Sequence, residues 1–442
     1  MSFNVGLSGL SAANKSLQVT GNNIANVATV GFKSSRAEFA DQYAQSIRGT
    51  SGGTNIGTGV TTSAISQNFT QGALNTGTGR DLDLAINGNG FFMVSNNGEK
   101  LYTRAGNFHT DTAGNIIDTN GNNLQGYGVD ANGNVKTGVL SNLRVDMSNM
   151  PPKATSAITL QSNLDSSKPI VTGAAFDPKD TSTYTTLINT KIYDSQGNEH
   201  QLNQYFRKNG DNAWTMYSLI DGRSIADPAA TPPVPDETQF TFDASGTLIT
   251  SPAPTSTANI AVNTDGTFTI KNWVPGQSKT VGTTTTWSAN GASSVTGGMK
   301  LDMLATTQTN AVAGPIAQHQ DGNYTGQISA MNVDATGTMF ATYTNGESRV
   351  IGQVSLSTFA NVQGLAPAGG TMWRETYASG IPVTGTPQSG TLGSITGSAL
   401  EESNVDLTAE LVELIKAQSN YQANAKTIST ESTILQTVIQ MT

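Results

Sequence analysis

The chain has 442 residues, 12% of them charged, and carries a formal net charge of −9 at pH 7. This length is enough for about two to four domains, and the acidic balance without any basic run argues against nucleic acid or an anionic membrane surface as a partner. The chain contains 47 glycines and no cysteine, so disulfides, thiol nucleophiles and cysteine-bound metals are excluded, and a β-rich, turn-rich protein is favoured.

The first 28 residues are predicted to form a helix that packs along its length. Apolar side chains recur on one side of it at heptad spacing, at Phe3, Leu7, Leu10, Leu17 and Ile24. Heptads of this kind are typical of helices that pack against other helices. Gly6, Gly9 and Gly21 each cost about 1 kcal/mol relative to alanine inside a helix, so this helix is expected to be marginal until it is packed on several sides.

The start of the chain also bears on the compartment. No apolar block resembles the core of a signal peptide or a membrane span, and the first charged side chain is Lys15. Taken alone, this pattern indicates a cytosolic protein. An extracellular location would therefore require an export route that cleaves no signal.

The middle of the chain is predicted to be β-structure. Leu82, Leu84 and Ile86 alternate with polar residues, as expected of a strand. The pattern D-x-x-G-N occurs four times, starting at Asp111, Asp118, Asp130 and Asp194. An aspartate in this position bonds the following backbone and the glycine adopts a left-handed conformation, so turns are predicted. The repeats lack the ligand set of an EF-hand loop, which argues against calcium.

Two stretches rich in Gly, Thr and Ser, at 48–80 and 378–399, flank this β-region. If both ends of the chain pair, each inner domain must be inserted into the one outside it. The predicted parts are a terminal helical pair (1–28 with 402–442), a connector with a short helix and extended Gly/Thr-rich chain (29–79 with 378–401), an inner β-domain (80–147 with 325–377) and an inserted outer β-domain (148–324). The predicted fold class is α+β, mostly β, with paired, coiled-coil-like terminal helices and two nested β-domains between them.

The last part of the chain is predicted to form the second helix, with Ser403 or Asn404 as its cap. Its apolar heptad positions are Leu407, Leu411, Leu414, Tyr421, Ile428, Leu435 and Ile439. Further apolar residues lie off this seam, at Val412, Ile415, Ile434 and Val438. Spacing alone favours a helical hairpin inside one globular domain. The off-seam residues shift the interpretation toward helices that self-assemble with other chains, because apolar surface of that sort seeks a partner.

Nothing in the sequence indicates an active site. The three histidines, His109, His200 and His319, show no catalytic or metal-binding spacing. The four tryptophans invite comparison with a carbohydrate-binding surface, but each lies in a strand-like run, where a core position is the ordinary explanation. We therefore expect no enzyme, no catalytic residue, no cofactor and no metal site.

Three segments resemble the flagellar rod and hook axial proteins. Gly21–Lys33 (GNNIANVATVGFK) resembles their N-terminal signature, and Leu400–Leu407 (LEESNVDL), continued at Tyr421–Ala425 (YQANA), resembles their C-terminal signature. Leu101–Phe108 (LYTRAGNF) is similar to part of their inner β-domain. The residues that carry the two terminal signatures are Asn22, Asn23, Ile24, Asn26, Gly31, Phe32, Ser403, Asn404, Val405 and Asp406.

Within this family the chain most resembles the hook proteins, because rod proteins are shorter and lack the insertion at 148–324. The resemblance implies a homopolymer that forms a tube and works as a flexible universal joint between motor and filament. It also implies type III export, without a cleaved signal peptide, to the extracellular hook of the bacterial flagellum. The implied partners are further copies of the chain and the flagellar rod, hook cap and hook–filament junction proteins, with neither nucleic acid nor membrane insertion. A distal-rod subunit and an extracellular β-rich adhesin or fibre protein are the alternatives.

Overall fold

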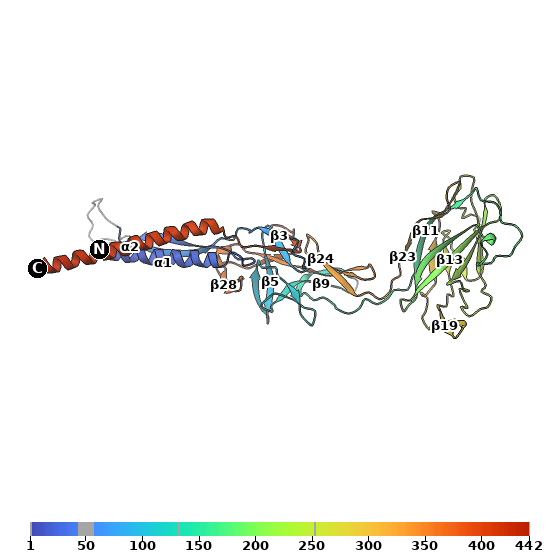
Figure 1. Cartoon of the computed structure of the whole chain (residues 1–442), viewed down its shortest axis with the longest axis horizontal. Coiled ribbons are helices and arrows are strands. Elements are labelled where there is room, and N and C mark those ends of the chain that lie inside the picture. Colours follow the sequence, from blue (N-terminus) through green and yellow to red (C-terminus); the bar gives the residue numbers. More distant parts are fainter. Residues whose placement is uncertain (1, 43–56, 131–132, 252, 442) are drawn as a thin grey trace. The chain divides into compact units, whose positions relative to one another are not determined.

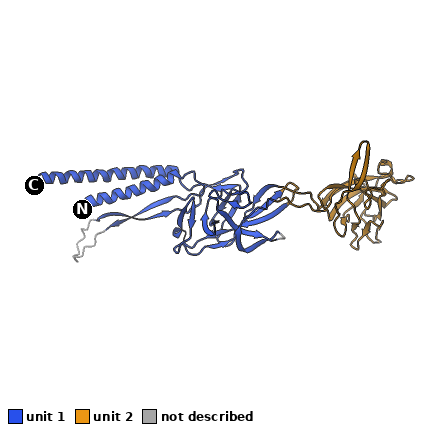
Figure 2. Ribbon diagram, turned by 90° about the horizontal axis from the view of Figure 1, so that it is seen from below, with its two compact units in different colours: residues 1–147, 328–342, 348–442 blue, residues 148–327, 343–347 orange. Residues whose placement is uncertain are grey.

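A computed structural model describes residues 2–42, 57–130, 133–251 and 253–441. The chain forms two compact units (Figure 2), of which the first comprises residues 1–147, 328–342 and 348–442 and the second comprises 148–327 and 343–347. The second unit is therefore inserted into the first along the sequence. Strands predominate between two terminal helices, which confirms the predicted α+β, mostly β class.

The two α-helices lie at the ends of the chain and both belong to the first unit (Figure 1). Helix α1 spans Ser2–Ala25 and helix α2 spans Leu407–Met441. The cap predicted at Ser403 or Asn404 is wrong: Asp406 Oδ1 accepts the backbone N–H of Thr408 at 2.9 Å and is the N-cap of α2. Neither helix in the described part of the chain has the length and apolar character that a membrane crossing requires.

A long hairpin follows α1. Strands β1 (Ser35–Gln42) and β2 (Gly59–Gln67) pair antiparallel. The described residues 29–42 and 57–79 contain no helix, so the short helix predicted in the connector is wrong there. β-branched residues such as Val60 and Ile65 favour the extended backbone of β2, and β1 is held extended by pairing with it. Residues 43–56 lie outside the described residues. The hairpin packs on α1, where Val60 N–H donates to Ser8 Oγ at 3.2 Å.

The first unit contains a large sheet and two short strand pairs. The 13-stranded sheet consists of β5 (Phe91–Asn96), β6 (Glu99–Thr103), β7 (His109–Thr110), β8 (Ile116–Ile117), β9 (Asn123–Val129), β10 (Val135–Asn142), β24 (Ile328–Val333), β25 (Thr338–Tyr343), β26 (Ser348–Val354), β27 (Leu356–Thr358), β28 (Ala366–Gly369), β29 (Met372–Arg374) and β30 (Val383–Gly385). The short pairs are β3 (Leu74–Thr76) with β32 (Ala399–Glu401) and β4 (Leu84–Asn87) with β31 (Ser394–Gly397). Leu84, Phe92 and Phe108 belong to the buried core of this unit. The β3–β32 pair places the start of the C-terminal signature inside β-structure.

The D-x-x-G-N repeats at Asp111, Asp118 and Asp194 form turns, as predicted, whereas the repeat at Asp130 includes residues 131 and 132, which lie outside the described residues. Asp118 Oδ1 accepts the backbone N–H groups of Asn120 at 2.8 Å and of Asn122 at 2.9 Å, and Gly121 has a φ of +82°. Asp194 accepts the same pair of hydrogen bonds in the second unit. These carboxylates are thus engaged by their own turns, and no group of three or more His, Asp or Glu side chains in the described residues is placed to hold a metal ion.

The second unit has two main sheets that share one core. The six-stranded sheet consists of β11 (Ala157–Asp165), β17 (Ile260–Val262), β18 (Phe268–Ile270), β21 (Met299–Asp302), β22 (Thr307–Thr309) and β23 (Gly314–Gln320), and the five-stranded sheet of β12 (Thr186–Tyr193), β13 (Glu199–Lys208), β14 (Ala213–Ile220), β15 (Asp236–Thr241) and β16 (Thr255–Ser256). Strands β19 (Gly276–Val281) and β20 (Thr284–Ala289) form a separate hairpin. Leu160 of the first sheet and Phe206 and Trp214 of the second are buried in one cluster, so the two sheets stabilise each other.

Candidate assembly site at the terminal helices

The two helices approach closely where α1 has glycine. A Cβ atom on Gly6 would lie 3.0 Å from Ile428 Cγ1, and a Cβ atom on Gly9 would lie 2.5 Å from Asn424 Oδ1. Helix propensity predicts that these glycines weaken α1. Each glycine costs about 1 kcal/mol of helix stability relative to alanine. This cost is offset because a residue without a side chain lets α2 pack closely against α1.

The helices run antiparallel, and their register leaves the end of α2 beyond the start of α1. Near the end of α1, Asn23 Nδ2 donates to Glu410 Oε1 at 2.9 Å. Near its start, Gly6 faces Ile428. Residues 432–441 of α2 therefore extend past the start of α1, as Figure 1 shows.

The predicted heptad residues divide into two groups in this single chain. Half-buried positions are Leu10, Leu17, Ile24, Leu414 and Ile428. Exposed positions are Phe3, Leu7, Leu407, Leu411, Tyr421, Leu435 and Ile439, with exposed fractions between 38% for Tyr421 and 72% for Ile439. The fully buried positions on the helices are small or polar, as at Ala13 and Ala417. One copy thus brings together only part of the predicted surface, because small residues occupy the line of closest contact.

The off-seam residues are also exposed. Val412, Ile415, Ile434 and Val438 of α2 have exposed fractions of 49%, 62%, 52% and 53%. Together with the exposed heptad positions, they make α2 apolar on faces that α1 does not cover. A helix surface of this kind usually marks a site of interaction with another chain.

Two asparagines of the terminal signatures hold the chain that leaves α1. Asn23 Oδ1 accepts the backbone N–H of Ser35 at 2.9 Å, and its Nδ2 donates to the carbonyl of the same residue at 2.8 Å. Asn404 Oδ1 accepts the backbone N–H of Ser34 at 2.7 Å, and its Nδ2 donates to the carbonyl of Asn68 at 2.7 Å. The two signatures therefore meet in one hydrogen-bonded junction.

A buried ion cluster lies in this junction, made of Lys33, Arg104 and Glu401. Lys33 Nζ pairs with Glu401 Oε1, while Arg104 Nη1 lies 3.1 Å from Glu401 Oε2. The side chains of Lys33 and Glu401 are 0% exposed and that of Arg104 is 5% exposed. The cations also donate to backbone carbonyls, Lys33 to Thr70 at 2.7 Å and Arg104 to Gly88 at 2.8 Å. The Glu401 carboxylate thus forms ion pairs with two buried cations.

Burial governs the protonation of these groups. Burial lowers the pKa of Lys33 and of Arg104, although the negative charge of Glu401 opposes both shifts. Burial raises the pKa of Glu410 at the start of α2, with the hydrogen bond from Asn23 opposing and the nearby acidic side chains adding to the rise. A buried pair stabilises little by itself, but removing one partner is strongly destabilising because the other charge is left in the interior.

The remaining signature residues are placed as follows. Gly31 has a φ of +69°, and a Cβ atom there would lie 2.4 Å from the backbone N of Ala105, so only glycine fits. Asp406 caps α2. Half-buried positions are Asn26, Phe32, Ser403 and Val405, and Asn22 is exposed.

The sequence alone did not single out the members of the ion cluster. Lys33, Arg104 and Glu401 all lie within the segments that carry the family resemblance, whereas the signature positions named from the sequence are neutral residues and Asp406. The sequence feature that points to these three residues is their charge, because only 12% of the side chains in this chain are charged. A charged residue next to apolar residues inside a signature indicates a buried residue with an oppositely charged partner.

Family models match along the chain. They are described as "Flagella basal body rod protein" for residues 3–33, "Flagellar hook protein FlgE/F/G D1 domain" for 85–167, "Flagellar basal body protein FlaE D2 domain" for 163–323 and "Flagellar basal body rod FlgEFG protein C-terminal" for 396–441. The N-terminal and C-terminal matches contain the two helices and most of the junction.

Full-length relatives carry the name "Flagellar hook protein FlgE". The Salmonella typhimurium protein is 38% identical over 447 residues and the Escherichia coli K12 protein is 37% identical over 449 residues, each comparison covering 100% of both chains. The Borreliella burgdorferi protein is 31% identical over 458 residues, covering 99% of this chain and 98% of the relative. A crystal structure of Helicobacter pylori flagellar hook protein FlgE2 matches with a TM-score of 0.45 and 13% identity, covering 75% of this chain and 100% of that one. On the full-length identities, the chain belongs to the flagellar hook protein family.

Proposed function

We propose that the chain is a structural subunit of the bacterial flagellar hook whose copies self-assemble through their terminal helices into a helical tube. The tube acts as a flexible universal joint that passes torque from the motor to the filament. The observation that carries the proposal is the apolar surface of α2 that α1 leaves uncovered in a single copy, in a chain of the hook protein family.

The energetics favour an interface that uses both the heptad and the off-seam residues. Complete burial of a large apolar side chain contributes about 1.5–3 kcal/mol. Association costs about 4–15 kcal/mol in lost freedom of motion. Because the exposed heptad positions are already partly covered in one copy, a single row of them offsets only part of the upper range of this cost. Burial of the off-seam residues as well, by helices of several neighbouring copies around each α2, makes assembly favourable.

The proposed mechanism separates stiffness from compliance. The helical pair (1–28 with 402–442) forms a continuous inner wall through apolar contacts, and the junction fixes the angle at which the chain leaves it. The connector (29–79 with 378–401), the inner β-domain (80–147 with 325–377) and the outer β-domain (148–324) make the weaker, polar contacts that slide when the tube bends.

We further propose that the chain is a non-enzymatic building block located in the extracellular part of the flagellum. It is exported by the flagellar type III apparatus without cleavage of a signal peptide. Its neighbours at the two ends of the tube are the flagellar rod and the hook–filament junction proteins, and the hook cap covers the growing end. Mass spectrometry of the subunit from purified hooks tests the export route, because an intact N-terminal peptide is expected.

The central experiment is assembly of the purified full chain, followed by electron microscopy. The expected product is a curved, bendable tube. Val438→Asp, which places a charge on the exposed face of α2, should abolish it. Val312→Asp, at a position 91% exposed in the second unit, is the matched control and should assemble normally. Tubes formed equally well by both variants would refute assembly through α2.

A distal-rod subunit is the second candidate. The family models at the two ends of the chain carry the description of rod proteins, whereas the full-length relatives carry the name of hook proteins. The same micrographs separate the two functions, because a rod is straight and rigid.

A further inference from the structure

One loop of the first unit exposes large apolar side chains almost completely. This loop, residues 376–383, is called the presenting loop. Tyr377 is 105% exposed, Ile381 is 88% exposed and Val383 is 66% exposed. Single exposed apolar residues are common, but three on one short loop form a patch of the kind that contacts another molecule.

The presenting loop is held in shape by its own hydrogen bonds. Ser379 is 0% exposed, its Oγ donates to the carbonyl of Thr376 at 2.8 Å, and the backbone N–H of Thr376 donates back to that Oγ at 2.9 Å. Asn361 Nδ2 donates to the carbonyl of Ala378 at 3.1 Å. At its end, Val383 pairs with Thr358 of β27. The exposed side chains are therefore presented on an ordered support, which lowers the entropic cost of docking them.

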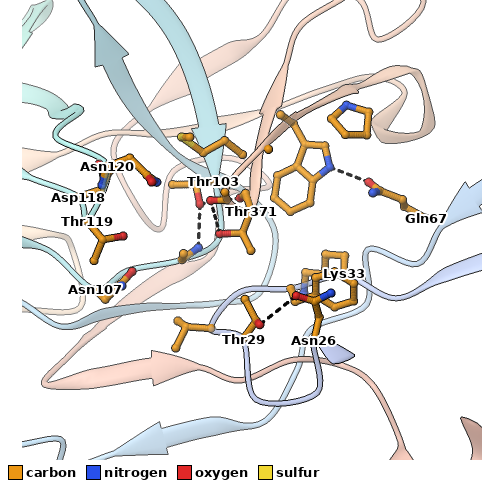
Figure 3. A pocket seen from close by; sticks show the side chains of 18 of the residues that line it. Asn26, Thr29, Lys33, Gln67, Thr103, Asn107, Asp118, Thr119, Asn120 and Thr371 are labelled. Carbon is orange, nitrogen blue, oxygen red and sulfur yellow. Dashed lines mark hydrogen bonds between the residues drawn. The ribbon is translucent and has the colours of Figure 1, made fainter. Parts of the chain in front are cut away.

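A groove of about 550 Å³ lies in the same unit, between the end of α1 and the β28–β29 hairpin (Figure 3). Its apolar lining includes Phe32, Met372 and Trp373. Amide side chains surround this lining, and Figure 3 shows Asn120 on one side of the pocket and Asn26 across from it. The groove thus offers apolar contact in its interior and amide donors and acceptors around it.

We propose that the presenting loop of one copy inserts Tyr377 into this groove of a second copy. The inference rests on the self-assembly proposed above, but it concerns a contact between β-structured parts rather than between helices. A tyrosine suits such a groove, because its ring packs against apolar side chains while its hydroxyl bonds to amides. Tyrosine is also enriched among the residues that dominate interface energetics.

Charge supports a second copy as the occupant. Each copy carries a net charge of −9, so copies repel one another overall, and a contact between neutral surfaces adds no further repulsion of like charges. Residues 376–400 contain no charged side chain. In the groove, Lys33 is already paired with Glu401, and Asp118 is engaged by its own turn. Because the loop and the groove are different patches of one chain, the contact can repeat from copy to copy without closing, as an open polymer requires.

Disulfide trapping tests the contact directly, because the chain has no cysteine of its own. Copies with Tyr377→Cys are assembled together with copies that carry Asn120→Cys, and the polymer is then oxidised and dissolved. A cross-linked dimer of twice 46.0 kDa is expected only in the mixture. Copies with Val139→Cys, at a position 75% exposed in β10, replace the Tyr377→Cys copies in the control. Normal polymer without the dimer, or an equal yield in the control, would overturn the proposal.

A second measurement does not depend on the cross-link. Tyr377→Ala should raise the critical concentration for assembly about tenfold and leave the unfolding of the monomer unchanged, because Tyr377 touches little of its own chain. An unchanged critical concentration contradicts the loop contact. Failure of the unmodified chain to form any polymer contradicts the proposed function instead, so the two failures are distinguishable.

Discussion

Replacing Glu401 by glutamine removes the anion that two buried cations share. Lys33 and Arg104 would then face each other with their side chains 0% and 5% exposed and no carboxylate between them. Removing one partner of a buried ion pair costs about 3–5 kcal/mol. Glu401→Gln should therefore lower the free energy of unfolding of the first unit by that amount or more.

The cluster is asymmetric, which makes the prediction sharper. Lys33→Met leaves Glu401 paired with Arg104 and bonded to the backbone N–H of Gly72 at 3.0 Å. The lost hydrogen bond to charged Glu401 costs about 1.5–3 kcal/mol. The hydrogen bond to the Thr70 carbonyl is lost as well, but that carbonyl keeps Asn404 Nδ2 as a donor at 3.2 Å. Glu401→Gln should consequently lower the free energy of unfolding more than Lys33→Met does.

The pH dependence of stability in the Glu401→Gln variant provides an independent test of the cluster. Burial lowers the pKa of Lys33, and the opposing effect of Glu401 is absent in this variant. Between the lowered pKa of Lys33 and the ordinary lysine pKa, the unfolded chain then binds more protons than the folded chain. Its free energy of unfolding should rise with pH in that range, more steeply than that of the parent.

Urea unfolding of the full chain, with hydrogen exchange of peptides from 84–128 reporting on the first unit, measures these differences. Glu402→Gln is the matched control, because Glu402 is exposed beside the cluster and its loss should change stability by less than about 0.5 kcal/mol. Equal costs for Glu401→Gln and Lys33→Met, or for Glu401→Gln and the control, would refute the reasoning.

Two further outcomes are expected. Gly21→Ala, at a position with nothing within 4 Å of the new Cβ atom, should stabilise α1 by up to about 1 kcal/mol. Gly9→Ala should not stabilise α1, because its Cβ atom would meet α2. Thermal unfolding followed by circular dichroism compares the two variants. Burial lowers the pKa of His200, but its hydrogen bonds to Asp221 (2.6 Å) and Asp194 raise that pKa by more, so the net shift is upward. The charged histidine therefore stabilises the second unit fully below its ordinary pKa of 6.5, and this contribution is lost as pH rises through the raised pKa. A His200→Gln variant whose unfolding has the same pH dependence as that of the parent would contradict this assignment.

Much of the fold follows from local patterns. The D-x-x-G-N turns form because an aspartate reaches the backbone N–H groups two and four residues ahead, as at Asp118, without help from the rest of the chain. Heptad spacing likewise indicates both terminal helices. The short helix predicted in the connector was wrong in the described residues because Gly- and Thr-rich composition does not report that two distant segments pair as a hairpin.

The candidate site was less accessible to sequence reasoning. Heptads show that a helix has an apolar side, but the register of α1 and α2 depends on how closely Gly6 and Gly9 let them approach, which no spacing reveals. Exposure of Ile439 likewise follows from that register, which leaves the end of α2 beyond the start of α1.

Composition, heptads and signatures by themselves determined the fold class, the existence of two terminal helices and the family. The tertiary structure alone decided which charged residues belong together, since Glu401 lies 368 residues from Lys33 and 297 from Arg104 along the chain. The physical reason is that a charge tolerates burial only beside an opposite charge, and that partner is supplied by the fold rather than by neighbours in sequence.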